Sequence, residues 1–321
     1  MMMVSPCDDD VPKTKTVVVR QVWASNLEEE FAHIKSILPL HGYVAIDTEF
    51  PGCIYKDKCH YSNLTPSQTY ATMKANVDAL NIIQLGLTIS DYAGNLPDLG
   101  TDSCCIWEFN FKDFDIEKDP HDPEAIRMLQ RQGINFSKNR VEGISSKDFR
   151  NLFFNSGLIF NRMMVQWITF HGCYDFGYLM KILLARELPQ DIASFGSAMS
   201  NLLGEDMYDM KHLMDFCCDG GFNGGLERLG KTLNVERVAG KTHEAGSDSL
   251  LTLHVYFKFR NDYLAENFEE EEQTLIMSMC KGVIYGLEDI IRSRPPPEIY
   301  YPCGLVCYYP LLVTTFDNVA V

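Results

Sequence analysis

Apolar residues recur along this chain at two spacings, one typical of helices and the other of strands. Apolar side chains at positions 27, 31, 34 and 38 follow a capping-box pattern at Ser25 and Glu28, which predicts an amphipathic helix that ends at Pro39. Residues 42–50 alternate as a half-buried strand does. The same patterns predict further strands at residues 79–90, 104–111, 165–170 and 208–214, and further helices at residues 122–133, 146–156, 174–188, 225–233 and 247–268.

The order of these elements predicts the fold class. Three strands in succession, followed by alternating strands and helices, predict an α/β domain with a mixed central sheet and helices on both faces. We expect a single domain over residues 17–290. Residues 1–16 are polar and are predicted to form a flexible arm, and residues 291–321 contain several prolines and are predicted to form a tail without a core of its own.

Composition narrows the possible functions. The chain has 321 residues, of which 46% are hydrophobic and 12% aromatic, so it can bury a sizeable core and is not a largely disordered chain. Its formal net charge is −16, from 44 acidic and 28 basic side chains. Proteins that bind nucleic acid indiscriminately are usually basic. The charge therefore argues against a general nucleic-acid-binding protein.

The eleven cysteines do not have the pattern of a disulfide framework, because their number is odd and two pairs are direct neighbours. They predict a reducing intracellular compartment. We expect neither a secretory signal nor a membrane span, because no basic-then-apolar leader and no run of eighteen apolar residues occurs. Cys53 with Cys59, and Cys303 with Cys307, lack the two-residue spacing of a zinc knuckle, so a structural zinc site is not expected.

The strand at residues 42–50 carries two acids, Asp47 and Glu49. Residues two apart on a strand point to the same side of the sheet, so the two carboxylates stand side by side. Like charges this close repel unless they share a cation, and a divalent metal would remove that cost. The alternative is that they form the exposed polar side of an edge strand.

Two later junctions each place an acid at the start of a helix. Asp175 lies where a strand gives way to a helix, and His243 precedes the last long helix, with Asp248 in its first turn. Taken singly, Asp175 and Asp248 are ordinary first-turn acids favoured by the helix dipole, and His243 is a loop histidine. His243 and Asp248 could nevertheless reach one small volume, and in this order the four acids and the histidine form a recognisable constellation.

This constellation resembles the DEDD exonucleases that carry a histidine, the group that includes RNase T and oligoribonuclease. Further segments are similar to the Ccr-associated factor (Caf/Pop) deadenylases, the catalytic nuclease subunits of the Ccr–Not complex, over roughly residues 20–290. Two positions depart from the family pattern, Cys173 in place of glycine and Glu244 in place of glutamine, and neither removes a ligand. The matching segments are residues 50–52, 76–78, 82–87, 107–111, 142–144, 174–179, 208–211 and 245–251.

The resemblance implies an RNase H-like (DEDD exonuclease) fold and removal of poly(A) from its 3′ end with release of 5′-AMP. It implies two divalent ions, Mg²⁺ or Mn²⁺, about 4 Å apart. Asp47 would bridge both ions, Glu49 and Asp248 would complete the first site, and Asp175 would complete the second. His243 would accept the proton of the attacking water. The implied partners are poly(A) RNA, the Not scaffold and a leucine-rich-repeat Ccr-type nuclease, and the implied location is both nucleus and cytoplasm.

Two other functions stay open. One is a catalytically weak binding subunit that tethers other deadenylase components, and the other is a DNA or short-oligonucleotide exonuclease of the same fold. The intact set of five residues favours an active poly(A) ribonuclease. The net charge of −16 predicts that the protein alone binds RNA weakly and in a salt-sensitive way.

Two further segments have more than one interpretation. A stretch that mixes charge with aromatic rings suits either a single-strand channel or a loop with buried tyrosines. The glycine-rich residues 220–225 lack the lysine and hydroxyl of a phosphate-binding P-loop and predict a turn and a helix start. The candidate channel residues are Tyr55, Lys56, Lys58, Tyr61 and Tyr70.

Overall fold

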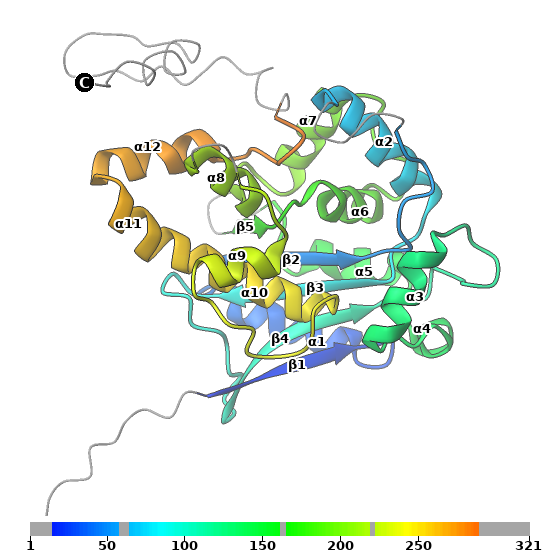
Figure 1. Ribbon diagram of the computed structural model, residues 1–321. Coiled ribbons are helices and arrows are strands. Elements are labelled where there is room, and N and C mark those ends of the chain that lie inside the picture. The colour runs from blue at the N-terminus through cyan, green and yellow to red at the C-terminus, as the bar shows by residue number, and fades with distance from the viewer. Residues whose placement is uncertain (1–14, 58–63, 161–164, 219–221, 289–321) are drawn as a thin grey trace, which may run out of the picture.

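The computed structural model describes residues 15–57, 64–160, 165–218 and 222–288 (Figure 1). The strands are β1 (Thr16–Val22), β2 (Tyr43–Glu49), β3 (Gln84–Ser90), β4 (Ser103–Asn110), β5 (Gln166–Thr169) and β6 (Met207–Asp209). The helices are α1 (Leu27–Ile37), α2 (Pro66–Ala79), α3 (Pro123–Gln132), α4 (Phe136–Glu142), α5 (Ser146–Asn155), α6 (Cys173–Leu184), α7 (Ile192–Leu202), α8 (Met210–Cys217), α9 (Leu226–Thr232), α10 (Ala245–Lys258), α11 (Leu264–Asn267) and α12 (Glu270–Cys280). A π-helical turn, η2 (Phe259–Tyr263), joins α10 to α11.

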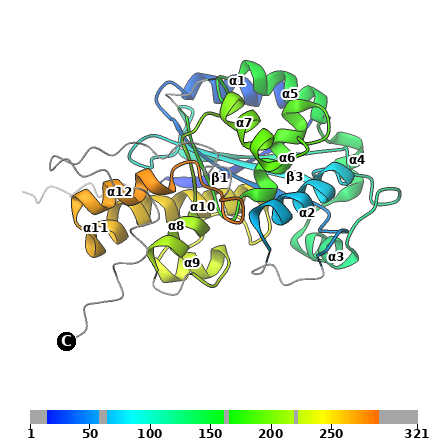
Figure 2. The same cartoon turned by 90° about the horizontal axis from the view of Figure 1, so that it is seen from above.

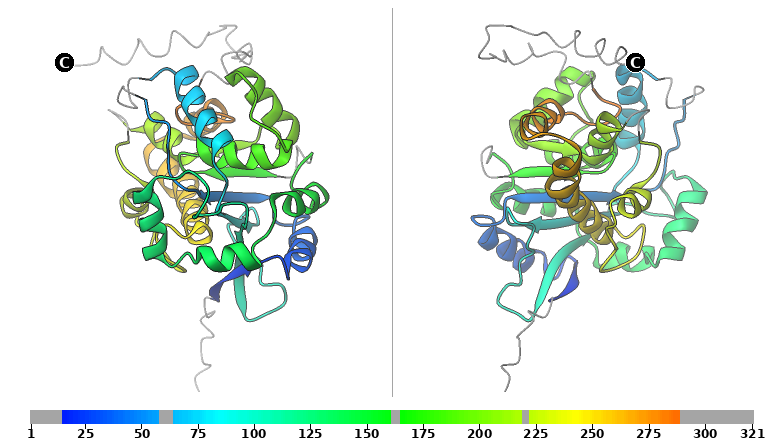
Figure 3. Two further views of the ribbon diagram at one scale, coloured as in Figure 1. Left: turned by 90° about the vertical axis from the view of Figure 1, so that its right-hand side faces the viewer. Right: turned by 60° about the vertical axis from the view of Figure 1, so that its left-hand side comes forward.

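The strands form one mixed sheet in the order β1-β4-β3-β2-β5-β6. β2 pairs antiparallel with β3 and parallel with β5, and β1 pairs parallel with β4. β1, the dark-blue strand of Figure 3, forms one edge and β6 the other. The strand that carries Asp47 and Glu49 is therefore central, which rules out the edge-strand alternative for these two acids.

Helices cover both faces of the sheet (Figure 2). Successive side chains of a strand point to opposite faces, and Val44 and Ile46 enter a core shared with α1, α2, α5, α6 and α7. Ala45 points the other way, into a second core shared with α8 to α12. The predicted α/β fold, a mixed sheet with helices on both faces in a single domain, is confirmed.

The structure corrects several predicted elements. The chain forms β1, α2, α4, α7 and α12, none of which was predicted. The predicted strand at residues 79–90 begins only at Gln84, because the preceding residues end α2. The predicted strand at residues 208–214 stops at Asp209, whose carboxylate accepts a hydrogen bond from the Lys211 amide at 3.0 Å and so starts α8. The predicted capping box at Ser25 does not form.

The start of α1 shows why that capping box fails. The N-cap residue is Asn26, and its side chain accepts no hydrogen bond from the backbone amides of the first turn. Its Oδ1 instead accepts a hydrogen bond from the Trp23 amide at 2.8 Å. The long helix predicted over residues 247–268 does form, as α10, η2 and α11 in succession.

The predicted domain boundaries fall mostly outside the described residues. β1 begins at Thr16, the last residue of the predicted arm. Residues 1–14 of that arm and the predicted tail at residues 291–321 lie outside the described part of the chain, so the arm and the tail stay predictions. Within the part that the structure describes, no helix combines the length and the apolar character needed to cross a membrane.

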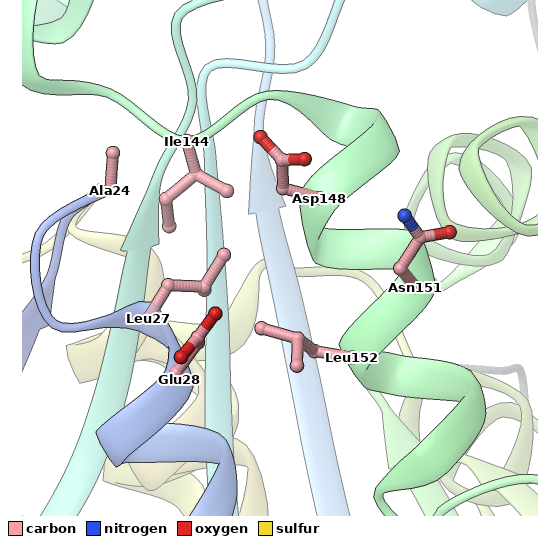
Figure 4. Close-up of a pocket in the computed structure, with 7 residues that line it drawn as sticks. All are labelled: Ala24, Leu27, Glu28, Ile144, Asp148, Asn151 and Leu152. Carbon is pink, nitrogen blue, oxygen red and sulfur yellow. The ribbon is translucent and has the colours of Figure 1, made fainter.

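A cavity of about 320 Å³ lies between the start of α1 and α5 (Figure 4). Both helices belong to the layer on the face away from α10, and none of the five candidate site residues lines the cavity. Its lining residues are Ala24, Leu27, Glu28, Ile144, Asp148, Asn151 and Leu152.

Candidate active site

The alternation of β2 places Asp47 and Glu49 on the face that α10 covers. Ala45, two residues before Asp47, packs in the α10 core, whereas Val44 and Ile46 pack in the opposite core. Glu49 is buried, and Asp47 keeps some exposure to solvent. The expectation that both acids leave the strand on one side is confirmed.

Polar residues continue from these acids across the neighbouring strands. Asp47 pairs with Gly86 of β3, and Gly86 pairs with Glu108 of β4. The buried Glu108 carboxylate accepts hydrogen bonds from Gln21 Nε2 at 2.8 Å and Gln84 Nε2 at 3.2 Å. No role for Glu108 was predicted, although an acid within an apolar strand such as β4 often has a structural or functional partner.

The N-terminus of α10 rests directly on the sheet at Gly86. A Cβ atom added there would lie 1.8 Å from the carbonyl oxygen of Ala245, so only glycine allows this approach. The amide of the next residue, Gly246, donates a hydrogen bond to Glu108 Oε2 at 2.9 Å. Glu108 thereby receives one of the N–H groups that a helix start leaves without an intrahelical partner.

This contact brings the second acidic segment beside the first. The ligand atoms of Glu49, His243 and Asp248 all lie within 4.8 Å of one another. His243 Nδ1 lies 3.9 Å from Glu49 Oε1, and the His243 amide donates a hydrogen bond to Asp248 Oδ2 at 3.0 Å. His243 adopts a left-handed backbone conformation with φ of +62°, which is uncommon for a residue other than glycine. The sequence-based expectation that His243 and Asp248 reach one volume is confirmed.

Asp175 enters the site from the first turn of α6, as predicted. Its Oδ1 accepts a hydrogen bond from Thr48 Oγ1 at 2.6 Å, so β2 holds this acid as well. The buried Asp209 fixes the preceding turn by accepting hydrogen bonds from the amides of His171 at 2.8 Å and Gly172 at 2.9 Å. Asp209 lies in a segment that matched the family, but its structural role depends on contacts that the sequence does not show.

The acids of the site resist ionisation. Burial, followed by the charges of Asp175, Asp248 and Glu49, raises the pKa of Asp47 well above its ordinary value. Burial, with the charge of Asp248 next, raises the pKa of Glu49 to about 8. Burial raises the pKa of Asp175 to about 7 and also raises that of Asp248, which the Arg237 guanidinium lowers in part. Full negative charge is therefore unfavourable in the metal-free site at neutral pH.

The donor set fits hard divalent cations. Glu49, His243 and Asp248 share one small volume, and the charges of Asp47 and Asp175 interact with this group. Oxygen-rich sites of this kind favour Mg²⁺ or Mn²⁺ over zinc. The mutual repulsion that raises the carboxyl pKa values is the cost that a bound cation would offset. The residues present therefore fit the divalent ions that the sequence led us to expect.

Other sequence predictions have mixed outcomes. Tyr70 is buried and donates a hydrogen bond to the Pro189 carbonyl at 2.6 Å, which is the buried-tyrosine alternative. Tyr55 and Lys56 are exposed, and Lys56 forms an ion pair with Asp122 at 2.8 Å. Lys58 and Tyr61 lie outside the described residues.

The glycine-rich segment and the cysteines follow the predictions where the structure describes them. Gly225 is the N-cap of α9, in agreement with the predicted helix start. All described cysteines are free thiols. Cys59, Cys303 and Cys307 lie outside the described part of the chain, so the zinc expectation is not tested there.

Comparison with known proteins gives a consistent picture. The family model "CAF1 family ribonuclease" matches residues 22–152. A probable CCR4-associated factor 1 homolog of Arabidopsis thaliana is 44% identical over 277 residues, which cover 86% of this chain and 94% of the relative. The poly(A) ribonuclease pop2 of Schizosaccharomyces pombe is 37% identical over 245 residues, which cover 76% of this chain and 70% of the relative.

Solved structures agree. S. pombe Pop2p in its Mg²⁺- and Mn²⁺-bound form superposes with a TM-score of 0.73 at 34% identity, covering 84% of this chain and 99% of that chain. The yeast CAF1 structure obtained with the NOT1 MIF4G domain superposes with a TM-score of 0.68 at 32% identity, covering 88% of this chain and 100% of that chain. The likeness therefore extends over most of the chain.

Proposed function

This chain belongs to the CAF1 ribonuclease family, and from that premise we propose that it is a metal-dependent 3′-to-5′ exoribonuclease. It would shorten the poly(A) tails of mRNA and release 5′-AMP, and would thereby promote mRNA decay and silencing. The observation that carries the proposal is the convergence of Glu49, His243 and Asp248 within 4.8 Å, with the charges of Asp47 and Asp175 acting on the same group. The relative named poly(A) ribonuclease supports the substrate class.

The proposed cofactors are two divalent ions, and the Mg²⁺- and Mn²⁺-bound form of Pop2p supports this choice. We propose that Asp47, Glu49, Asp175 and Asp248 hold the ions. When bound, the ions would supply the positive charge that activates water and stabilises the leaving 3′ oxygen. The carboxylates would lose their protons on binding, so we expect ion affinity to rise with pH.

His243 is the proposed general base. Its side chain is 44% exposed, so water can reach it, and its Nδ1 faces Glu49 Oε1. A neutral imidazole at this position could accept the proton of the attacking water. The His243 amide meanwhile holds Asp248, so one residue both carries the proton and helps to fix an acid.

The substrate is tested with RNA that carries a 5′ label and a 3′ tail of adenosines. With Mg²⁺ we expect stepwise shortening from the 3′ end with 5′-AMP as the product, faster than for uridine or cytidine tails. Equal rates on all tails or on DNA would favour the general exonuclease. No shortening in Mg²⁺ or Mn²⁺ would favour the tethering subunit. Low ionic strength is the suitable starting condition, because a net charge of −16 disfavours RNA binding.

We further propose that the chain assembles with a Not scaffold and a leucine-rich-repeat Ccr-type nuclease, in both nucleus and cytoplasm. The yeast CAF1 structure obtained with the NOT1 MIF4G domain supports the first partner, and the second partner and the location rest on the family resemblance. We expect a purified MIF4G domain to co-elute with this chain in size-exclusion chromatography. A tagged copy in cells should recover both partners and appear in both compartments, and separate elution would contradict the scaffold assignment.

A further inference from the structure

Arg237 contacts the acidic site from the segment between α9 and α10. Its Nη2 donates a hydrogen bond to Asp248 Oδ1 at 2.5 Å, and its Nη1 donates one to Ser247 Oγ at 2.5 Å. The arginine side chain is only 14% exposed. The guanidinium thus grips two successive residues in the first turn of α10, one of which is a proposed metal ligand.

The other side of the guanidinium is fixed by Glu227 of α9. Arg237 Nε donates a hydrogen bond to Glu227 Oε1 at 3.0 Å, and Nη2 contacts the same oxygen. Thr242 Oγ1 donates to this oxygen as well, at 3.0 Å. A planar guanidinium can hold several acceptors in one fixed geometry, which a lysine ammonium cannot do. Arg237 therefore ties α9 to the start of α10.

The two carboxylate oxygens of Asp248 accept hydrogen bonds from different residues. Oδ1 accepts from Arg237, and Oδ2 accepts from the amide of His243. Arg237 therefore holds one oxygen, and His243, whose Nδ1 lies 3.9 Å from Glu49 Oε1, holds the other. Without the hydrogen bond from Arg237 to Oδ1, the Asp248 side chain could rotate away from Glu49.

We propose that Arg237 is a positioning residue that holds Asp248 in the orientation needed to bind a divalent ion, and that Glu227 fixes Arg237 for this task. The inference rests on the proposed metal-dependent function and adds two residues to it. Partners that orient metal ligands in this way are typically worth about 10–100-fold in metal affinity. Arg237 also partly offsets the negative charge around Asp47 and Asp248.

The test measures ion binding without RNA. We expect Arg237→Gln to weaken the apparent Mn²⁺ affinity by about 10–100-fold in isothermal titration calorimetry. Arg228→Gln is the matched control, because Arg228 is exposed on α9, and we expect it to bind Mn²⁺ as the wild type does. Wild-type affinity in Arg237→Gln would overturn the proposal.

Two milder variants keep the test decisive if Arg237→Gln fails to fold. Arg237→Lys retains the charge but not the planar fork, so we expect reduced Mn²⁺ affinity despite normal folding. Glu227→Gln keeps Arg237 but weakens its anchor, and we expect a smaller loss of affinity. Wild-type Mn²⁺ affinity in Arg237→Lys would overturn the positioning role in favour of charge alone.

These results are separable from the test of the proposed function. If the wild type binds Mn²⁺ in an Arg237-dependent way and yet fails to shorten adenosine tails, the proposed reaction is overturned. That result leaves the positioning role of Arg237 standing. If Arg237→Gln shortens tails normally and binds Mn²⁺ with unchanged affinity, the positioning role of Arg237 is overturned and the proposed reaction still stands.

Discussion

Replacing Asp47 by Asn is expected to lower the rate of adenosine-tail shortening by about 1,000-fold or more, which corresponds to about 4 kcal/mol of transition-state stabilisation. Asp47 lies among Glu49, Asp175 and Asp248, whose charges all raise its pKa, so it occupies the centre of the charge that a divalent ion would neutralise. An amide nearly matches the carboxylate in shape and carries no charge. The measurement is single-turnover shortening of labelled RNA in Mg²⁺ and Mn²⁺.

The same variant should be more stable than the wild type when metal is removed. A carboxyl group whose pKa is raised by folding keeps its proton longer in the folded state than in the unfolded state. Below its pKa in the unfolded state, such a group does not lower the free energy of unfolding. It lowers that free energy progressively as the pH rises from there to its pKa in the folded state. For Glu49 this window runs from its ordinary value of 4.5 to about 8. Removing the Asp47 charge relieves part of this penalty.

We therefore expect metal-free Asp47→Asn to unfold at a temperature a few degrees above the wild type at pH 8, about 2–4 °C for each kcal/mol, with a smaller difference at pH 5. The control is Asp102→Asn, which removes the same charge from an exposed loop and should change neither activity nor the slope with pH. An active Asp47→Asn enzyme, or one that is less stable at pH 8 without metal, would contradict the site assignment.

Replacing Gly86 by Ala is expected to cost about 100-fold in activity without touching any proposed ligand. The added Cβ would lie 1.8 Å from the Ala245 carbonyl oxygen and 2.5 Å from the Gly246 nitrogen, so the start of α10 must move away from the sheet. That helix start carries Asp248, and a shift of about 1 Å in a catalytic group typically costs about 100-fold. Overpacking of this kind also costs about 1–3 kcal/mol of stability.

Activity and thermal unfolding of Gly86→Ala, measured together, check this expectation. Gly225→Ala is the matched control, because a Cβ atom added at Gly225 meets no atom within 4 Å. We expect that control to keep wild-type activity. Wild-type activity in Gly86→Ala would mean that α10 does not need to rest on β3 for the acids to meet.

Much of the fold could be predicted from local patterns. The strand at Asp47, the helix between Asp122 and Gly133, and the helix starts at Asp175 and Asp248 all follow from alternation or from terminal residues. Helix α2 was not predicted, although its sequence contains a helix-start signal. Thr65 directly precedes Pro66 and forms a capping box with Gln68. The apolar residues of α2 show only weak helical spacing, because the buried face of the helix includes polar residues such as Asn76. The pattern of apolar residues therefore did not predict this helix.

The buried Asn76 also shows why some assignments needed the folded structure. Its side-chain oxygen accepts hydrogen bonds from the amides of Ile54 at 2.8 Å and Tyr55 at 2.9 Å, which fixes the loop that leaves β2. A polar residue satisfied by a distant loop cannot be told from an exposed one in the sequence. Tyr70 illustrates the same limit, since its burial depends on packing against residues far along the chain.

The sequence by itself indicated which side chains we propose to carry the chemistry. Asp47 and Glu49 share one face because a strand has a period of two, and Asp175 and Asp248 occupy first turns because local signals place the helix starts. Only the tertiary structure decided how these pieces meet. Gly86 and Arg237 act through contacts between segments that are distant in the chain, where no local rule applies, and the free energy of such contacts depends on packing that is set only when the sheet and α10 come together.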